Sequence, residues 1–175
     1  MSIPEKLHKI NFLSFVEKKN LVCFFLAILF FTLDRITKIK IIDNQLNNNQ
    51  VYINDFINLE LIWNTGIGFG LLSYNTTFIY NSITAMIGFV IIFMIYLLIK
   101  SSLIERFFFS LVVGGALGNL QDRIFFNAVP DFIDFHVGNF HWFIFNVSDI
   151  FITLGVISMI ALELADNKTE KQNND

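Results

Sequence analysis

The sequence predicts an all-α membrane protein with four transmembrane helices and a small β-rich loop that faces outward. Of its 175 residues, 54% are hydrophobic, and the mean hydropathy is +0.59; both values are high for a soluble domain. The apolar residues occur in long runs, and no Asp, Glu, Lys or Arg lies between Leu61 and Ile99. Four stretches reach the roughly 20 residues that a ~30 Å hydrocarbon core demands.

The four predicted spans cover residues of about 20–42, 76–99, 103–126 and 141–162. The first is not expected to be a cleaved signal peptide, because Asp34 and Arg35 follow its apolar run where a cleavage site would lie. No internal repeat is visible, which argues against the duplicated halves of many transporters. We therefore expect a single membrane domain over residues 1–175.

The segments between and after the spans have different characters. In the outer loop 43–75, the stretch "QVYINDFINLELIWN" (50–64) roughly alternates β-branched and aromatic residues with polar ones, and glycines follow it. This pattern predicts a small sheet or hairpin on the membrane surface. The connection 127–140 is expected to be a short outer loop. The polar tail 166–175 is expected to be disordered.

The distribution of Lys and Arg predicts the orientation in the membrane. With four spans both termini share one side, and that side carries eight of the twelve basic residues, namely Lys6, Lys9, Lys18, Lys19, Lys100, Arg106, Lys168 and Lys171. The other side carries Arg35, Lys38, Lys40 and Arg123. Basic residues favour the cytoplasmic side, so we expect cytoplasmic termini. Trp63 and Trp142 then suit an outer aromatic belt.

Composition also limits the partners and cofactors. No cluster of Lys and Arg of the kind that DNA binding needs is present, so a nucleic-acid partner is not expected. Cys23 is the only cysteine, which excludes an intrachain disulfide. His136 and His141, with Asp131 and Asp134, follow no zincin spacing. We therefore expect no metal and interpret the histidines as interfacial residues.

The polar residues inside the predicted spans gather in one layer. At 1.5 Å per residue, Asp34 lies about 9 Å and Asp149 about 10 Å below the outer end of its helix. The third span and the connection after it bring further polar residues to this level: Asn119, Asp122, Arg123, Asp131 and Asp134. Ionisable groups at such depth face the bundle interior, pair with one another and commonly mark functional sites.

Structural roles explain some of these residues. Asp34 and Lys38 are four residues apart, so an ion pair on one helix face accounts for both. Arg123 can hold Asp122, or reach another carboxylate, in a structural ion pair. Asp149 is harder to explain in this way, because no Lys or Arg lies within a helical turn of it.

Carboxylates near an outer surface, without a Ser or Cys nucleophile pattern, point to aspartyl protease chemistry. When two carboxyl groups share one proton, the ionised group takes a proton from water while the neutral group donates to the substrate carbonyl. Burial and like charge separate the two pKa values, so both roles exist together. The residues themselves leave the partner of Asp149 open among Asp34, Asp122, Asp131 and Asp134.

A proton- or cation-coupled transport subunit is the alternative, because it would use intramembrane carboxylates as a relay. A relay requires polar groups that continue across the bilayer. The inner halves of two spans, Leu21–Leu33 and Ile150–Leu162, carry no charged residues. This distribution favours the enzyme.

Four blocks of the sequence resemble the lipoprotein signal peptidase (signal peptidase II) family of bacterial inner-membrane aspartyl proteases. They are "DRITK" (34–38), "NTGIGFG" (64–70), "GGALGNLQDR" (114–123) and "VPDFIDFHVGNFHWFIFNVSD" (129–149). The resemblance covers roughly residues 20–162. Three positions depart from the usual pattern of the family, namely Gly68, Pro130 and Ser148.

The resemblance implies the roles of individual residues. Asp131 and Asp149 match the catalytic dyad of the family. Four residues match positions that orient the dyad and hold the substrate: Asn119, Asp122, Arg123 and Asn146. Four more match positions that are structural or contact the substrate: Asp34, Lys38, Asn64 and Gly66.

The resemblance also implies the reaction and its location. The substrate is a prolipoprotein whose cysteine carries diacylglycerol, and cleavage occurs just before that cysteine without a cofactor. The enzyme lies in the bacterial inner membrane among lipids, with its active site near the outer face. The loop 43–75 is expected to fold over this site.

Overall fold

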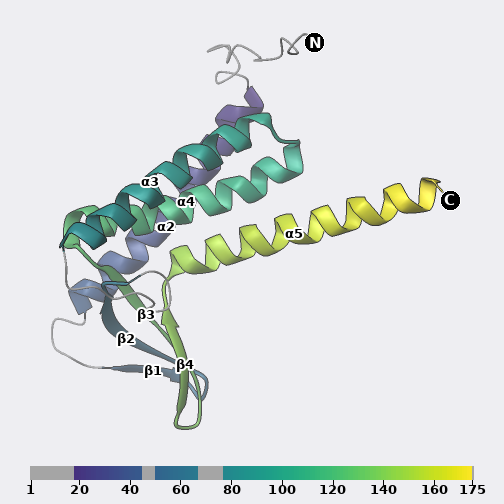
Figure 1. Cartoon of the computed structure of the whole chain (residues 1–175). Coiled ribbons are helices and arrows are strands. Elements are labelled where there is room, and N and C mark those ends of the chain that lie inside the picture. The colour runs from purple at the N-terminus through teal and green to yellow at the C-terminus, as the bar shows by residue number, and fades with distance from the viewer. Residues whose placement is uncertain (1–17, 45–49, 67–76, 175) are drawn as a thin grey trace.

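The computed structural model describes residues 18–44, 50–66 and 77–174. The elements follow one another as α2 (Lys18–Asn44), β1 (Val51–Asn54), β2 (Ile57–Asn64), α3 (Thr77–Lys100), α4 (Leu103–Phe126), β3 (Val129–Val137), β4 (Phe140–Phe145) and α5 (Val147–Asn174). The helices form a bundle, and a four-stranded sheet projects from one of its ends (Figure 1). The beginning of α2 and the end of α5 both point away from the sheet.

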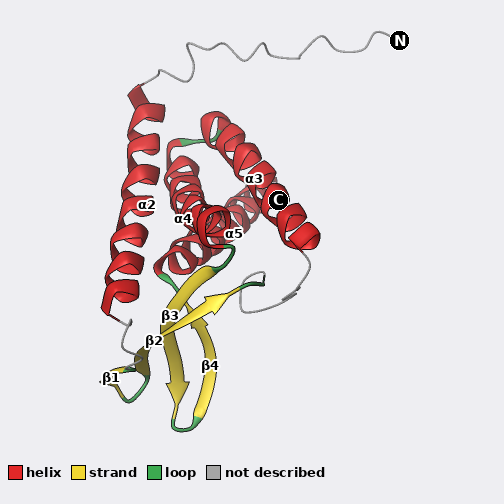
Figure 2. Cartoon of the chain, turned by 90° about the vertical axis from the view of Figure 1, so that its left-hand side faces the viewer, coloured by secondary structure: helices red, strands yellow, loops and turns green. Residues whose placement is uncertain are grey.

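Helix α4 is the centre of the bundle, because α2, α3 and α5 all pack against it (Figure 2). Glycines allow this close packing. A Cβ atom on Gly114 would lie 2.6 Å from the backbone oxygen of Ala27 in α2. A Cβ atom on Gly115 would lie 2.6 Å from the backbone oxygen of Ser148 in α5. The glycine-rich block of the sequence is therefore a surface on which two helices approach α4.

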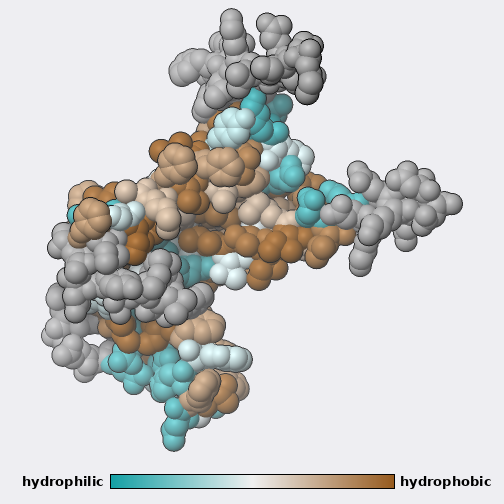
Figure 3. Space-filling view, in the orientation of Figure 1, coloured by the Kyte–Doolittle hydropathy of each residue, from teal (hydrophilic) through white to brown (hydrophobic). Residues whose placement is uncertain are grey.

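Within the described residues, three helical segments are long and apolar enough to cross a membrane: Tyr80–Lys100, Leu103–Phe126 and Val147–Asp166. In Figure 3, hydrophobic side chains cover the visible face of α5 as far as the hydrophilic residues near its C-terminal end. Phe89 and Ile157 have exposed fractions of 73% and 58%, respectively, which is unfavourable in water and favourable in lipid. These segments match the second and third predicted spans and most of the fourth.

Helix α2, the first predicted span, is not among these three segments. It has 27 residues, and its second half carries five charged residues: Asp34, Arg35, Lys38, Lys40 and Asp43. The structure thus shows a mostly helical protein with three candidate spans and a small antiparallel sheet.

The sheet has the strand order β1-β2-β3-β4, with every neighbouring pair antiparallel. The turn between β1 and β2 is closed by Asn54, whose Oδ1 accepts hydrogen bonds from the backbone N–H groups of Phe56 (2.9 Å) and Ile57 (3.0 Å). The hairpin predicted within 50–64 is therefore confirmed. Residues 45–49 and 67–76 of the predicted loop lie outside the described residues.

Strands β3 and β4 differ from the prediction, which made 127–140 a loop and began the last span at residue 141. The stretch "FHWFIF" (140–145) is apolar except for His141, and such a short run is compatible with either a helix or a strand. Its aromatic residues favour a strand once β3 is available as a partner. The last helix consequently begins at Val147 instead of residue 141.

Helix α5 also extends beyond its predicted end. It continues to Asn174, where the sequence predicted a disordered tail from residue 166. Good helix formers such as Leu162, Glu163 and Ala165 lead into this part of the chain, which lets the helix propagate past its apolar segment.

Candidate active site

Asn146 and Asp149 form the N-terminal cap of α5. Asn146 Oδ1 accepts a hydrogen bond from the backbone N–H of Asp149 at 3.1 Å, and Asp149 Oδ2 accepts one from the backbone N–H of Asn146 at 3.1 Å. This reciprocal pattern is that of a capping box, here with Asp in place of Glu. It places Asp149 in the first turn of the helix, where the helix dipole favours a negative charge.

This position corrects the depth estimated from the sequence. That estimate assumed that Trp142 and Asp149 lie on one helix, seven residues apart. In the structure Trp142 belongs to β4, and only the last part of the interval is helical. Asp149 is therefore at the start of the helix, next to the sheet.

Asp131 is the second carboxylate at this point. It lies on β3 with an exposed fraction of 4%. Its Oδ1 accepts a hydrogen bond from Asn146 Nδ2 at 2.6 Å, and its Oδ2 accepts one from Asn64 Nδ2 at 2.9 Å. Asn146 thus contacts both Asp131 and Asp149, which brings the carboxylates of a strand and a helix to one amide side chain.

Asn119 and Lys38 support Asp149 from the other side. Asn119 Nδ2 on α4 donates to Asp149 Oδ1 at 2.9 Å. The Oδ1 of the same asparagine accepts a hydrogen bond from Lys38 Nζ at 2.8 Å, which orients the amide with its N–H toward the carboxylate. Lys38 is fully buried, so its position is determined by the groups around it.

Lys38 belongs to an ion network between α2 and α4. Its Nζ lies 2.9 Å from Asp34 Oδ2 and 2.7 Å from Asp122 Oδ2. Arg35 Nη1 lies 2.6 Å from Asp122 Oδ1, and Arg35 Nη2 lies 3.1 Å from Asp34 Oδ2. Asp34 also accepts a hydrogen bond from the backbone N–H of Ser148 at 3.0 Å, which ties α2 to the start of α5. Two positive and two negative charges therefore balance one another in this network.

The structure confirms the predicted pair of Asp34 and Lys38. The alternative pairing of Arg123 with Asp122 is wrong, because Asp122 pairs with Lys38 and Arg35. Adjacent residues on a helix point in different directions. Arg123 instead donates to the backbone oxygen of Gly66.

Arg35 and Tyr80 are the contributors that the sequence reasoning missed. The sequence analysis gave Arg35 no role in the site. Its place in the "DRITK" block, as one of the four basic residues on the predicted outer side, could have indicated one. Tyr80 has its ring centroid 5.8 Å from Arg123 Cζ, within cation–π range. An isolated Tyr at the start of an apolar helix carries no signal that would identify this contact.

Within the described part of the chain, Asp131 and Asp149 differ from the carboxylates of the ion network in their lack of a cationic partner. Among the described residues, no Lys or Arg makes an ion pair with Asp131 or Asp149. Burial and the nearby charge of Asp149 raise the pKa of Asp131 to about 6, although hydrogen bonds from Asn64 and Asn146 oppose the shift. A carboxyl group in this state is suited to hold a proton.

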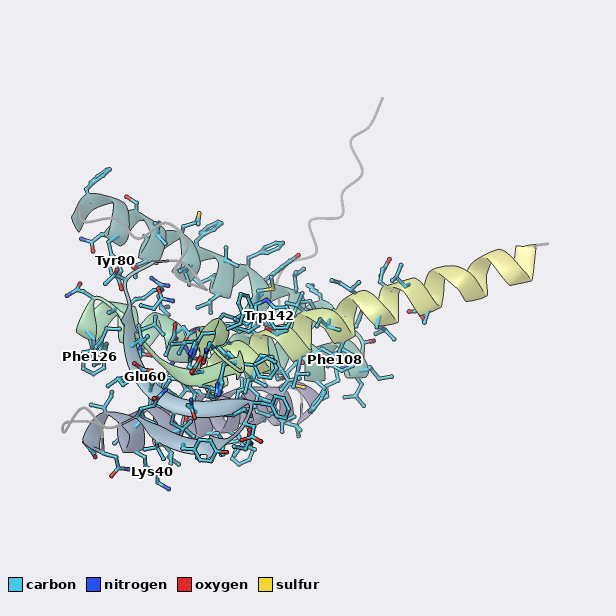
Figure 4. All side chains as sticks on the ribbon, turned by 90° about the horizontal axis from the view of Figure 1, so that it is seen from below. Lys40, Glu60, Tyr80, Phe108, Phe126 and Trp142 are labelled. Atoms are coloured by element: carbon cyan, nitrogen blue, oxygen red, sulfur yellow. The ribbon has the colours of Figure 1, made fainter. Side chains whose placement is uncertain are left out.

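A cavity of about 280 Å³ opens beside these groups, and its polar lining consists of Asn64, Asn119, Arg123, Asp131, Asp149 and Thr153. Nitrogen and oxygen atoms gather where the beginning of α5 meets α4 and the strands, whereas Lys40 projects away from the bundle (Figure 4). A second groove of about 250 Å³ has an apolar lining of Phe143, Phe145, Ile150 and Leu154 and also reaches Asp149.

The structure also places the other residues that the sequence singled out. Gly66 donates through its backbone N–H to Asn64 Oδ1 at 2.9 Å, which orients the amide that contacts Asp131. Ser148 is fully buried and is not in the lining of the cavity. Asp134 lies outside the site, with its carboxylate 2.8 Å from His141 Nδ1. Gly68 is outside the described residues.

Comparisons with known proteins agree on one family. The family model described as Signal peptidase (SPase) II matches residues 26–165. A lipoprotein signal peptidase of Pelagibacter ubique is 48% identical over 95% of this chain and 100% of its own length. One of Francisella tularensis subsp. novicida is 42% identical over 86% of this chain and 96% of its own length.

A solved structure described as a bacterial membrane enzyme superposes with a TM-score of 0.72 and is 31% identical, covering 85% of this chain and 90% of that chain. The apolar helices and these matches define a protease that crosses the bacterial inner membrane several times. The chain belongs to the signal peptidase II family.

Proposed function

We propose that this chain is an aspartyl endopeptidase that removes signal peptides from lipoprotein precursors, with Asp131 and Asp149 as its catalytic dyad. The observation that carries the assignment is the contact of Asn146 with both carboxylates. Of the other buried carboxylates, Asp34 and Asp122 are paired with cations and are therefore poorly suited to share a proton, and Asp134 contacts His141 away from the cavity.

The proposed mechanism uses one proton shared by the dyad. Asp131, whose pKa is raised to about 6, holds the proton, and Asp149 is ionised. Asp149 takes a proton from a water molecule, the resulting hydroxide attacks the amide carbonyl carbon, and Asp131 donates its proton to the carbonyl oxygen. As the tetrahedral intermediate collapses, the C–N bond breaks, the proton held by Asp149 passes to the leaving amine, and one hydroxyl of the intermediate returns its proton to Asp131.

Three amide side chains position the dyad. Asn64 and Asn146 donate to Asp131, and Asn119 donates to Asp149. These contacts orient the two carboxyl groups and leave acceptor sites on them available to the water molecule. Arg123, on the wall of the cavity, is placed to bind backbone carbonyl groups of the substrate.

The proposed membrane arrangement has four spans, with α2 as the first. Its charges are compatible with a span, because Asp34, Arg35 and Lys38 pair within the bundle and with Asp122. The side that would hold both termini carries eight basic residues and the other side four. The termini are then cytoplasmic and the sheet end, with the dyad, faces outward.

The substrate is proposed to carry a diacylglyceryl group on the cysteine that follows the cleaved bond. The apolar groove beside Asp149 supports this assignment, because acyl chains can lie against its phenylalanine and aliphatic side chains while the peptide enters the polar cavity. Membrane lipid surrounds the exposed apolar helix faces. A transport function has no support from the comparisons.

The test is cleavage of two precursors by the purified protein in detergent, one diacylated at cysteine and one unlipidated. The protein should cleave only the diacylated precursor, directly before the cysteine. Asp131→Asn and Asp149→Asn should abolish cleavage, whereas Asp43→Asn, at an exposed position of α2, should retain it. Substantial turnover by Asp149→Asn would falsify the assignment of the dyad.

A further inference from the structure

Asp134, His136 and His141 form a cluster on the sheet, outside the catalytic cavity. Each offers one ligand atom, and these atoms all lie within 4.8 Å of one another. Asp134 Oδ2 lies 2.8 Å from His141 Nδ1 and 3.6 Å from His136 Nδ1. Ligands that surround a tetrahedral zinc ion at 2.0–2.2 Å are separated by about 3.3 Å, so these distances fit one ion after small side-chain movements.

The strand pairing explains how the three side chains come to one face. Asp134 and His136 are two residues apart on β3 and therefore point to the same side of the sheet. The pairing of β3 with β4 shifts register between Phe135 and His136, and the shift places His141 opposite His136. Such an irregularity redirects a side chain, and here the two imidazole rings stack with centroids 5.2 Å apart.

Two polar atoms of this face lack partners, which points to a ligand. His136 has an exposed fraction of 7%, and its Nδ1 has no hydrogen-bond partner among the described residues. Asn58 pairs with Asp134 across β2 and β3, so its side chain shares this face. Its Oδ1 is also buried without a partner in the described structure. Buried polar atoms without partners are costly, and a bound ion would satisfy both.

We propose that Asp134, His136 and His141 bind a divalent transition-metal ion, with Zn²⁺ as the best match. Two imidazole nitrogens and one carboxylate oxygen are ligands that zinc accepts. The side chain of His141 is 51% exposed, which gives the ion a path from solvent. Asn58 Oδ1 or a water molecule completes the coordination. To bind the ion, His141 Nδ1, which lies 2.8 Å from Asp134 Oδ2, must present its lone pair and carry no proton.

The metal ion would stabilise the sheet and would take no part in cleavage of the peptide bond. Asp134 follows Asp131 by three residues on β3, which corresponds to about 10 Å along the strand and to opposite faces of the sheet. The ion would join β3 to β4 and so hold the strand that carries Asp131. The spacing of the histidines matches no metal motif, and for this reason the sequence predicted no metal here.

The test is Zn²⁺ binding by the full chain in detergent, purified without affinity-tag histidines and treated with a chelator beforehand. Calorimetric titration should show one Zn²⁺ per chain, and saturating Zn²⁺ should raise Tm. His141→Ala, at a half-exposed position, and Asp134→Asn should each weaken binding at least tenfold and remove the rise in Tm. The control is His8→Ala, which removes the one histidine outside the cluster and should bind like the unmodified protein.

The outcomes are distinct for a metal site and for a simple ion pair. If His141 and Asp134 form only an ion pair, their variants lower Tm equally with and without Zn²⁺. Stoichiometry well below one ion per chain, or unchanged affinity in His141→Ala, would overturn the proposal. Cleavage of the diacylated precursor tests the proposed function separately, because the cluster lies outside the dyad.

Discussion

Asn146 donates its side-chain N–H to Asp131 Oδ1 at 2.6 Å, and the amide is completely buried. The same residue directly precedes α5 and caps it by accepting a hydrogen bond from the backbone N–H of Asp149. A single asparagine therefore couples the end of the sheet to the beginning of a helix. The relative position of the two carboxylates depends on this connection.

The two roles of Asn146 can be separated by substitution. Ser at this position retains an N-cap oxygen but cannot reach Asp131, whereas Ala loses both contacts. We expect Asn146→Ser to lower kcat by about 10²-fold through misplacement of the dyad while nearly preserving Tm. Asn146→Ala should lower kcat similarly and cost about 1 kcal/mol of stability in addition. Cleavage rates and thermal unfolding of both variants provide the measurement; equal kcat for Asn146→Ser and the unmodified protein would contradict the role in positioning.

The protonation of Asp131 predicts a pH dependence. Its pKa is raised from 3.8 to about 6, so kcat/KM should fall as pH rises through about 6 and the shared proton is lost. Asn64→Leu removes a hydrogen bond of 2.9 Å that lowers this pKa, and the alkaline limb should move to higher pH. The measurement is the pH profile of kcat/KM for both proteins. A limb that moves to lower pH in Asn64→Leu would show that the amide does not stabilise the charged form.

The same shift has a consequence for stability. Between pH values of about 4 and 6 the folded state binds more protons at Asp131 than the unfolded state does. The contribution of this residue is therefore fully present below pH 4 and is lost as pH rises through about 6. Asp131→Asn removes the titration, so its Tm should exceed that of the unmodified protein more at pH 7 than at pH 4. Thermal unfolding at the two pH values tests this sign.

Lys38 is expected to be essential for the bundle as well as for the site. It is fully buried and contacts Asp34, Asp122 and Asn119. Lys38→Met leaves buried negative charge uncompensated, a type of change that costs about 3–5 kcal/mol. Lys40→Met, at an exposed position two residues later, is the control and should have little effect. A Tm of Lys38→Met equal to that of Lys40→Met would exclude the network as a source of stability.

The contact between α2 and α4 predicts opposite effects of Ala at two glycines. A Cβ on Gly114 would lie 2.6 Å from a backbone oxygen of α2, whereas the nearest atom to a Cβ on Gly88 is a flexible leucine carbon at 3.9 Å. Gly114→Ala should push the helices apart and lower Tm and activity. Gly88→Ala should be neutral or stabilise α3 by up to about 1 kcal/mol. Thermal unfolding of the two variants compares them directly.

The sequence was sufficient to predict several local features. The apolar runs indicated three spans that the structure shows, and alternation indicated the hairpin of β1 and β2. The spacing of Asp34 and Lys38 predicted their ion pair. Each of these features depends on residues that are close in the chain, where period and spacing determine geometry.

Other features depend on contacts between distant segments. The largely aromatic stretch "FHWFIF" is a strand because β3 lies beside it, and Asp149 is consequently at the start of a helix. Asp122 pairs with Arg35 and Lys38 across the helix interface instead of with its neighbour Arg123.

From the residues alone, the sequence determined that carboxylates gather in one layer of a membrane protein, and a family resemblance was needed to select Asp131 as the partner of Asp149. Only the tertiary structure decided how these two are held together and which carboxylates are neutralised. The physical reason is that pairing and protonation depend on distances of a few Å between side chains on different elements, and packing of those elements determines such distances.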